Sequence, residues 1–88
     1  MYAVVLSDEA KKQLAKLDRY NAKLLISWMR KNLENCTDPF VKGKPLSGDR
    51  KGTWRYRVGN YRIIADIQND KLIILVLAVG DRKDVYRK

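Results

Sequence analysis

The chain has 88 residues, of which 45% are hydrophobic and 33% charged, and its formal net charge is +9 at pH 7. This length suits one small domain, and we expect residues 1–88 to fold as a single unit. The longest apolar run, residues 72–79, is far shorter than the roughly 20 residues of a membrane helix, which excludes a membrane protein.

The first part of the chain predicts one strand followed by two helices. Residues 2–6 form a short apolar run with two valines, which is typical of a strand. Ser7 is a helix-capping residue followed by two carboxylates, and it predicts a helix that runs to about Leu17. After a break at residues 18–21, apolar residues at helical spacing predict a second helix that ends near Asn35.

The two helices should form a hairpin that covers one face of the later strands. We interpret the Trp28 and Met29 stripe of the second helix as core rather than as a ligand site. Residues 36–51 then form a lysine-rich loop, and so long a loop in a small domain is usually functional or mobile. Cys36 can form no internal disulfide and no histidine can activate it, so we expect an inert thiol and, with no export segment, the reducing cytoplasm.

Three strands follow this loop. Residues 53–58 alternate apolar and polar side chains, and Gly-Asn at 59–60 suits a two-residue hairpin turn into a return strand over 61–67. A second two-residue turn is expected at 69–70, before a strand over 72–79 that is apolar on both faces and therefore central. The predicted fold is α+β, in the order β-α-α-β-β-β, with a mainly antiparallel sheet, the helix hairpin on one face and an open basic face.

The predicted hairpin gathers cations. If the polar faces of its two strands lie on the same side, Arg55, Arg57 and Arg62 converge on one surface. Three guanidinium groups repel each other, so an anionic partner explains their grouping better than a solvated strand face does. Residues 41–62 carry seven cations against the single acidic residue Asp49, which amounts to six of the nine net positive charges: Lys42, Lys44, Arg50, Lys51, Arg55, Arg57 and Arg62. Such concentration indicates a binding surface for a polyanion.

Three segments together resemble the RelE/ParE toxin superfamily, and its RelE branch in particular. They are Lys-Pro-Leu-Ser-Gly at 44–48, Trp-Arg-Tyr-Arg-Val-Gly-Asn-Tyr-Arg at 54–62 and Val-Gly-Asp-Arg-Lys-Asp-Val-Tyr at 79–86. The resemblance implies a RelE-like fold and a bacterial toxin that cuts mRNA in the ribosomal A site. It also implies a RelB-like antitoxin, through which the toxin joins a DNA-bound repressor complex. The implied reaction needs neither metal nor cofactor, because the ribose 2′-hydroxyl attacks the adjacent phosphate.

The resemblance assigns roles to particular residues. It implies that Arg62 and Arg82 clamp the reacting phosphate, since guanidinium offers paired donors that match phosphate oxygens. Arg55 and Arg57 are also expected among the catalytic residues, where they bind the flanking backbone and help to neutralise the reacting phosphate. Tyr86 is expected to stack on a base of the message, with proton donation or anchoring of the tail as its alternatives. The remaining cations of the segment are expected to bind RNA: Lys42, Lys44, Arg50 and Lys51.

Two positions depart from the family pattern. Some relatives have an arginine where this chain has Ser47, and many have a histidine where it has Asp81. Since arginine does not release its proton at neutral pH, Lys44 and Asp81 are the candidate general bases. The alternative for Asp81 is an ion pair with the neighbouring Arg82 or Lys83.

Two other functions fit parts of the sequence. A ParE-like inhibitor of DNA gyrase would share this fold without nuclease chemistry. The combination of Arg62, Arg82 and Tyr86 favours the nuclease. The second alternative, a non-catalytic nucleic-acid-binding module, is supported by charge alone.

Overall fold

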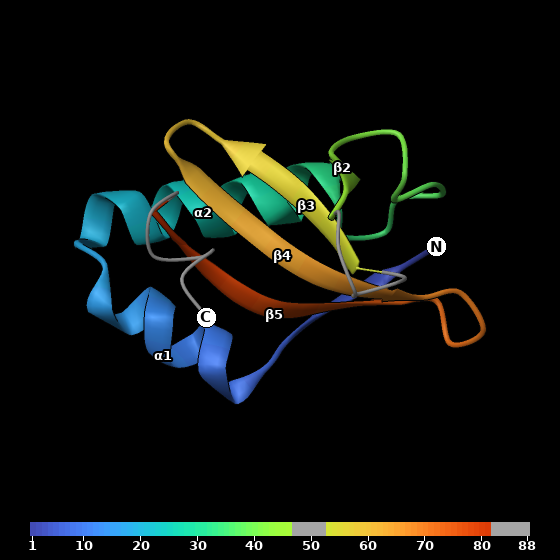
Figure 1. Ribbon diagram of the computed structural model, residues 1–88, viewed down its shortest axis with the longest axis horizontal. Helices are drawn as coiled ribbons and strands as arrows, with labels where there is room; N and C mark the ends of the chain where they lie inside the picture. The colour runs from blue at the N-terminus through green and yellow to red at the C-terminus, as the bar shows by residue number, and fades with distance from the viewer. Residues whose placement is uncertain (47–52, 82–88) are drawn as a thin grey trace.

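The computed structural model describes residues 1–46 and 53–81 of the chain. Its elements are β1 (Ala3–Leu6), α1 (Asp8–Lys16), α2 (Arg19–Asn32), β2 (Lys44–Pro45), β3 (Thr53–Val58), β4 (Tyr61–Gln68) and β5 (Ile73–Asp81). The strands form one sheet in the order β1-β5-β4-β3-β2, in which β1 runs parallel to β5 and the other pairs are antiparallel (Figure 1). The predicted α+β fold is confirmed, and β2 is an additional strand inside the segment expected to be a loop.

Both helices begin at a side-chain cap. The Oγ of Ser7 accepts a hydrogen bond from a backbone N–H of α1 at 3.1 Å, and a carboxylate oxygen of Asp18 accepts one from the N–H of Asn21 at 3.2 Å. The Asn21 side chain also donates to Asp18, and these hydrogen bonds lower the pKa of that carboxyl. Because Asp18 is itself the cap, α2 begins at Arg19 and the connection is shorter than predicted. Neither helix in the described part of the chain is long and apolar enough to cross a membrane.

The outer edge of β1 is covered by the segment that follows α2. This helix ends at Asn32, before the predicted Asn35, which adopts a left-handed φ of 63°. The N–H of Asn35 donates to the carbonyl of Tyr2 at 2.7 Å, and the carboxylate of Glu34 accepts from the N–H of Val4 at 3.0 Å. Since open strand edges invite pairing with other chains, these bonds protect this edge of the sheet.

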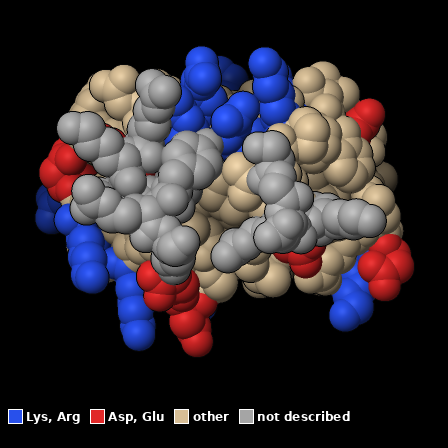
Figure 2. Space-filling model, viewed as in Figure 1, with Lys and Arg blue, Asp and Glu red and all other residues tan. Residues whose placement is uncertain are grey.

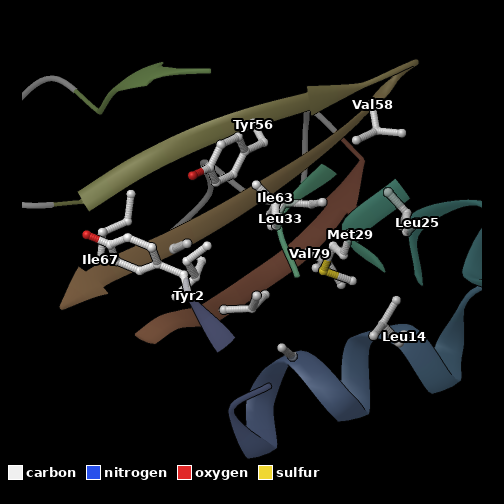
Figure 3. Packing of buried hydrophobic residues seen from close by; sticks show 14 residues of the cluster. Tyr2, Leu14, Leu25, Met29, Leu33, Tyr56, Val58, Ile63, Ile67 and Val79 are labelled. Carbon is white, nitrogen blue, oxygen red and sulfur yellow. The ribbon is translucent and has the colours of Figure 1, made fainter. Parts of the chain in front are cut away.

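The core lies between the helices and one face of the sheet (Figure 3). Its largest fully buried side chains come from α2, the segment after it and three strands: Leu25, Leu33, Tyr56, Ile63, Ile74, Val76 and Val79. Met29 is buried among them, as predicted. Trp28 is only half buried, and its ring packs against Tyr56 with 5.7 Å between centroids.

The two hairpin connections differ. Gly59 has a φ of 60° and Asn60 is not left-handed, which is the pattern of a type II′ turn and confirms the two-residue connection between β3 and β4. The connection between β4 and β5 is longer than predicted, because Leu72 belongs to the loop with a left-handed φ of 54°. Consequently β5 begins at Ile73, and it continues through Gly80 rather than ending there.

Candidate functional site

The pairing of β3 with β4 brings the predicted cations together. Arg57 pairs with Arg62 and Arg55 pairs with Ile64, at positions that alternate with the core residues Tyr56 and Val58. These three arginines therefore share the sheet face opposite the helices, as predicted, and we call this surface the cationic face. The face is less open than expected, because Arg62 and Ile64 are buried at its centre whereas Arg57 is exposed.

Arg62 is the most enclosed cation of this face, with 6% of its surface exposed. Its Nη1 donates to the carbonyl oxygen of Tyr61 at 3.1 Å, and within the described residues no carboxylate forms an ion pair with it. On one side its neighbour is another cation, Arg57, and on the other side it is Gly80, which has no side chain. A buried guanidinium beside a second one is unfavourable unless an anion compensates them, so this arrangement suits a phosphate.

A bulge in β5 decides which residue lies beside Arg62. Ala65 of β4 pairs with Val76, but Arg62 pairs with Gly80, so β5 holds one more residue than β4 between these pairs. In a regular ladder, continued from the Ala65 pair, Val79 would lie opposite Arg62 and its side chain would occupy that side. Because a one-residue shift moves every later side chain to the other face, the bulge turns Val79 into the core and places Gly80, which has no side chain, next to Arg62.

Two polar side chains of the α1 region hold this bulge. The hydroxyl of Ser7 donates to the carbonyl of Leu77 at 3.2 Å, and the side-chain oxygen of Gln13 accepts from the N–H of Val79 at 2.7 Å. Ser7 thus caps α1 and bonds the bulge with one hydroxyl group. The helix thereby stabilises backbone groups that a regular strand pair would otherwise satisfy.

The segment before β2 is held close to β3. Lys44 pairs with Arg55, and the indole N–H of Trp54 donates to the carbonyl of Lys42 at 2.7 Å. Gly43 lies between the two lysines with a φ of 76°, and a Cβ added there would lie 2.3 Å from the carbonyl oxygen of Arg55. Only glycine fits this approach, which brings both lysines to the edge of the cationic face.

Two aromatic side chains of β3 hold Pro39 and Phe40 in place. The hydroxyl of Tyr56 donates to the carbonyl of Pro39 at 2.6 Å, and burial raises the pKa of Tyr56 far above its ordinary value. The hydroxyl therefore stays protonated as a donor. Phe40 meets Trp54 edge to face with 4.9 Å between ring centroids. These contacts fix the position from which Lys42 extends.

A depression of about 420 Å³ opens between this segment, the outer edge of β3 and α2. It is lined by Trp28, Lys42, Gly43, Lys44, Arg55 and Arg57. Figure 2 shows Lys and Arg side chains gathered along the upper edge of the molecule, where β3 lies in Figure 1. Pockets of about 300 to 1,000 Å³ accommodate small ligands. Neither the depression nor the part of Trp28 that lines it was predicted, since the sequence shows only a tryptophan beside an apolar stripe.

The remaining predicted site residues are placed as follows. Lys44 lies beside Arg55, on the cationic face. Asp81 is exposed at the end of β5 and pairs with Tyr61, one position beyond the Gly80 and Arg62 pair, so alternation directs it toward the other face. The other predicted positions lie outside the described residues: Ser47, Arg50, Lys51, Arg82, Lys83 and Tyr86.

The described residues offer few groups for metal binding or for nucleophilic catalysis by a thiol. Residues 1–46 and 53–81 contain no cluster of three or more His, Cys, Asp or Glu that could hold a metal ion. Cys36 is partly buried, and this burial raises the pKa of its thiol, which disfavours the nucleophilic thiolate. Phosphate binding by cations is the chemistry that this site supports.

The family of the chain follows from comparison with known proteins. A family model described as the ParE toxin of the type II toxin-antitoxin system parDE matches residues 4–86. The chain belongs to the RelE/ParE toxin superfamily. Within it this toxin falls in the RelE-like branch, since it is 29% identical over 87 residues to Toxin RelG of Mycobacterium tuberculosis, covering 99% of this chain and 98% of RelG.

Solved structures share the fold of this chain. The matching chain in the crystal structure of the toxin-antitoxin complex RelBE2 from Mycobacterium tuberculosis is 27% identical, with a TM-score of 0.83, and the match covers 92% of this toxin and 98% of that chain. The isolated E. coli RelE toxin is 21% identical, with a TM-score of 0.71, and the match covers 98% and 92% of the two chains. The RelE-like fold expected from the sequence is therefore confirmed.

Proposed function

We propose that this type II toxin cleaves mRNA in the ribosomal A site, without a metal ion or cofactor. The observation that supports this function best is the pairing of Arg57 with a buried Arg62, next to Gly80 and with no carboxylate partner for Arg62 in the described residues. This arrangement provides guanidinium donors beside a residue that has no side chain, which suits a reacting phosphate.

The proposed reaction is an internal transesterification. The ribose 2′-oxygen loses its proton and attacks the adjacent phosphorus, while the bond to the 5′-oxygen breaks and that oxygen gains a proton. The products are a 2′,3′-cyclic phosphate and a free 5′-hydroxyl. Negative charge accumulates on the five-coordinate phosphorus in the transition state, so preorganised cations should be the largest catalytic contribution.

The roles of the cations follow from their positions and from the family resemblance. Arg62, together with Arg82 from the family pattern, clamps the transition state, and Arg55 and Arg57 hold the flanking phosphates. Tyr86 stacks on a base of the message. Other lysines and arginines of the central segment bind RNA of the message or the ribosome: Lys42, Lys44, Arg50 and Lys51.

Lys44 is the better placed of the two candidate general bases. It lies beside Arg55 on the cationic face, whereas Asp81 lies beside Tyr61. Comparing Lys44→Ala with Asp81→Asn in single-turnover cleavage tests this choice. We expect the larger loss for Lys44→Ala, and a larger loss for Asp81→Asn would reverse the assignment.

A RelB-like antitoxin is the proposed partner. Solved relatives include RelB–RelE complexes from E. coli and Pyrococcus horikoshii, although their identity with this chain of 19% and 23% shows only a shared fold. An acidic or amphipathic segment of the antitoxin would neutralise the cationic face, and through the antitoxin the pair would form a DNA-bound repressor complex. Both toxin and partner would act in the bacterial cytoplasm.

Induction of the toxin without its partner tests this function. Mapping of mRNA 5′ ends on translating ribosomes should show cuts in phase with codons. The family model that matches the chain is named for ParE, which makes inhibition of DNA gyrase the second candidate. Intact messages accompanied by DNA breaks would support gyrase inhibition and reject the nuclease.

A further inference from the structure

We propose that the depression between α2 and the edge of β3 binds one nucleotide of single-stranded RNA, with its base stacked on Trp28. This inference rests on the proposed function and adds to it a subsite that positions the message beside the proposed phosphate site, which is formed by Arg57 and Arg62. Trp28 would be a positioning residue, because it contributes a surface for a base and takes no part in the reaction.

The two tryptophans near this site have different surroundings. Trp54 has its N–H bonded to the carbonyl of Lys42 and its ring against Phe40, so its role is structural. Trp28 packs part of its ring against Tyr56 at a tilt of 52°, and another part lines the depression. Within residues 1–46 and 53–81 its indole N–H has no hydrogen-bond partner. A partly exposed ring with a spare donor is suited to an aromatic ligand that also carries acceptors.

The positive charges around Trp28 favour an anionic ligand. Lys42, Lys44 and Arg57 are exposed at the depression, and Arg55 also lines it. Sites for single-stranded nucleic acid combine such cations, which follow the phosphate backbone, with aromatic rings on which bases stack. The volume of about 420 Å³ is within the range that a small ligand fills. Arg57 belongs to both the depression and the phosphate site, so a nucleotide bound here would be continuous with the reacting strand.

The backbone of β3 adds polar groups at the same place. The carbonyl of Thr53 accepts from the N–H of Leu46 at 3.0 Å, and Arg55 pairs with Lys44, so alternate residues of β3 direct their backbone groups away from β4. Arg57 is the next residue in this series, and β2 ends before reaching it on the described part of the chain. Its N–H and C=O groups are therefore available to the polar edge of a base.

An extended acidic peptide could use the same strand edge, but it would not require an exposed indole ring among four cations. A nucleotide uses the ring, the cations and the backbone groups together. The observations therefore favour RNA, and the two ligands are separated experimentally below.

Binding of a short single-stranded RNA to the purified toxin tests the subsite. The RNA carries 2′-O-methyl riboses, which prevents cleavage by 2′-hydroxyl attack. Trp28→Leu should weaken binding roughly 5- to 150-fold, the range for one base stacked on an aromatic ring, while Trp28→Phe should retain most of the affinity. Tyr20→Leu is the matched control, because Tyr20 is an aromatic residue of the same helix that is 73% exposed away from the depression, and it should bind as wild type.

A second ligand separates stacking from a structural effect. An RNA that lacks the one contacted base should bind wild type as weakly as the intact RNA binds Trp28→Leu, and Trp28→Leu should lose nothing further. The intact RNA should quench the tryptophan fluorescence of wild type, the abasic RNA should not, and Trp28→Phe should bind without this quenching. The fluorescence comparison on wild type remains decisive even if Trp28→Leu fails to fold.

Several results would overturn the subsite. They are equal RNA binding by all variants, quenching that does not depend on the base, and a Trp28→Leu defect that is the same with the abasic RNA. A Trp28→Leu variant that loses affinity only for an acidic peptide would identify a peptide site instead. If ribosomes show no cleavage while Trp28-dependent RNA binding persists, the proposed nuclease activity fails but the subsite stands.

Discussion

The two faces of the sheet are built from the same strands and have opposite chemistry. The face toward the helices holds fully buried apolar residues such as Tyr56, Ile63 and Ile74. The opposite face pairs Arg57 with Arg62 and places Arg55 beside Lys44. Because successive strand residues point to opposite faces, stability and ligand binding are encoded at alternating positions. Substitutions on the two faces should therefore produce separable defects.

The largest expected loss of stability comes from the covered face. Ile74→Ala should lower the free energy of unfolding by about 2 to 5 kcal/mol, because it leaves a cavity where the side chain is fully buried. Urea denaturation measures this loss, and cleavage per folded molecule should be unchanged. Ile73→Ala, on the other face of β5 and only half buried, is the control. An equal loss in both variants would contradict the assignment of the core to one face.

The largest expected loss of activity comes from the opposite face. Arg62→Ala should lower single-turnover cleavage on the ribosome by about 10²- to 10³-fold, because it removes a donor that acts mainly in the transition state. Ribosome binding should stay nearly intact. Arg62→Lys keeps the charge but loses the paired donors, and an intermediate rate is expected. If Arg62→Ala lost binding instead of turnover, the clamp would be wrongly assigned.

Gly43 and Gly59, which both have a left-handed φ, allow a sharper test of the segment that borders both faces. Gly59→Ala should cost about 1 to 2 kcal/mol of stability, the penalty for a left-handed residue, since nothing lies within 4 Å of its added Cβ. Gly43→Ala has the same penalty and a clash with the carbonyl of Arg55. It should destabilise more and also weaken RNA binding, because both adjacent lysines must move. Thermal melting and RNA titration measure the two effects, and unchanged RNA binding by Gly43→Ala would show that the lysines do not depend on this approach.

The smallest expected effect concerns the strength of ribosome binding and its dependence on salt. Replacing Lys42 and Lys44 together by Ala should weaken ribosome binding and reduce the slope of log affinity against log salt by about 2, roughly 1 for each phosphate contact. A double alanine variant of Lys11 and Lys12, exposed on α1, removes the same charge elsewhere and is the control. Equal slopes for the two variants would indicate a diffuse charge effect instead of a defined RNA contact.

Much of this architecture could be read from local sequence. The cap at Ser7, the alternation of residues 53–58 and the Gly59 turn act over a few residues, and each was predicted correctly in kind. The convergence of the arginines followed from the same alternation, because a two-residue turn determines the register of the hairpin. Boundaries were less accurate, since the C-terminal end of α2 and the start of β5 depend on contacts with distant segments.

Tertiary structure alone decided what surrounds the arginines. The sequence shows Val79 and Gly80 side by side, and only the bulge in β5, bonded by Ser7 and Gln13 from a distant part of the chain, places Gly80 next to Arg62. No periodicity within a strand reveals an extra residue whose position is set by side chains more than sixty residues away.

The same contrast applies to Trp28. Its spacing on α2 determined that it would face the sheet, and its contact with Tyr56 agrees with that expectation. Its position at the rim of a cationic depression depends on where β2 ends along β3 and on the close approach of Gly43 to Arg55. Local sequence determines which face of an element is apolar, because the spacing of side chains along the backbone is regular. Which side chains line a depression between elements, such as the one beside Trp28, depends on how distant elements pack together, and no local spacing specifies this.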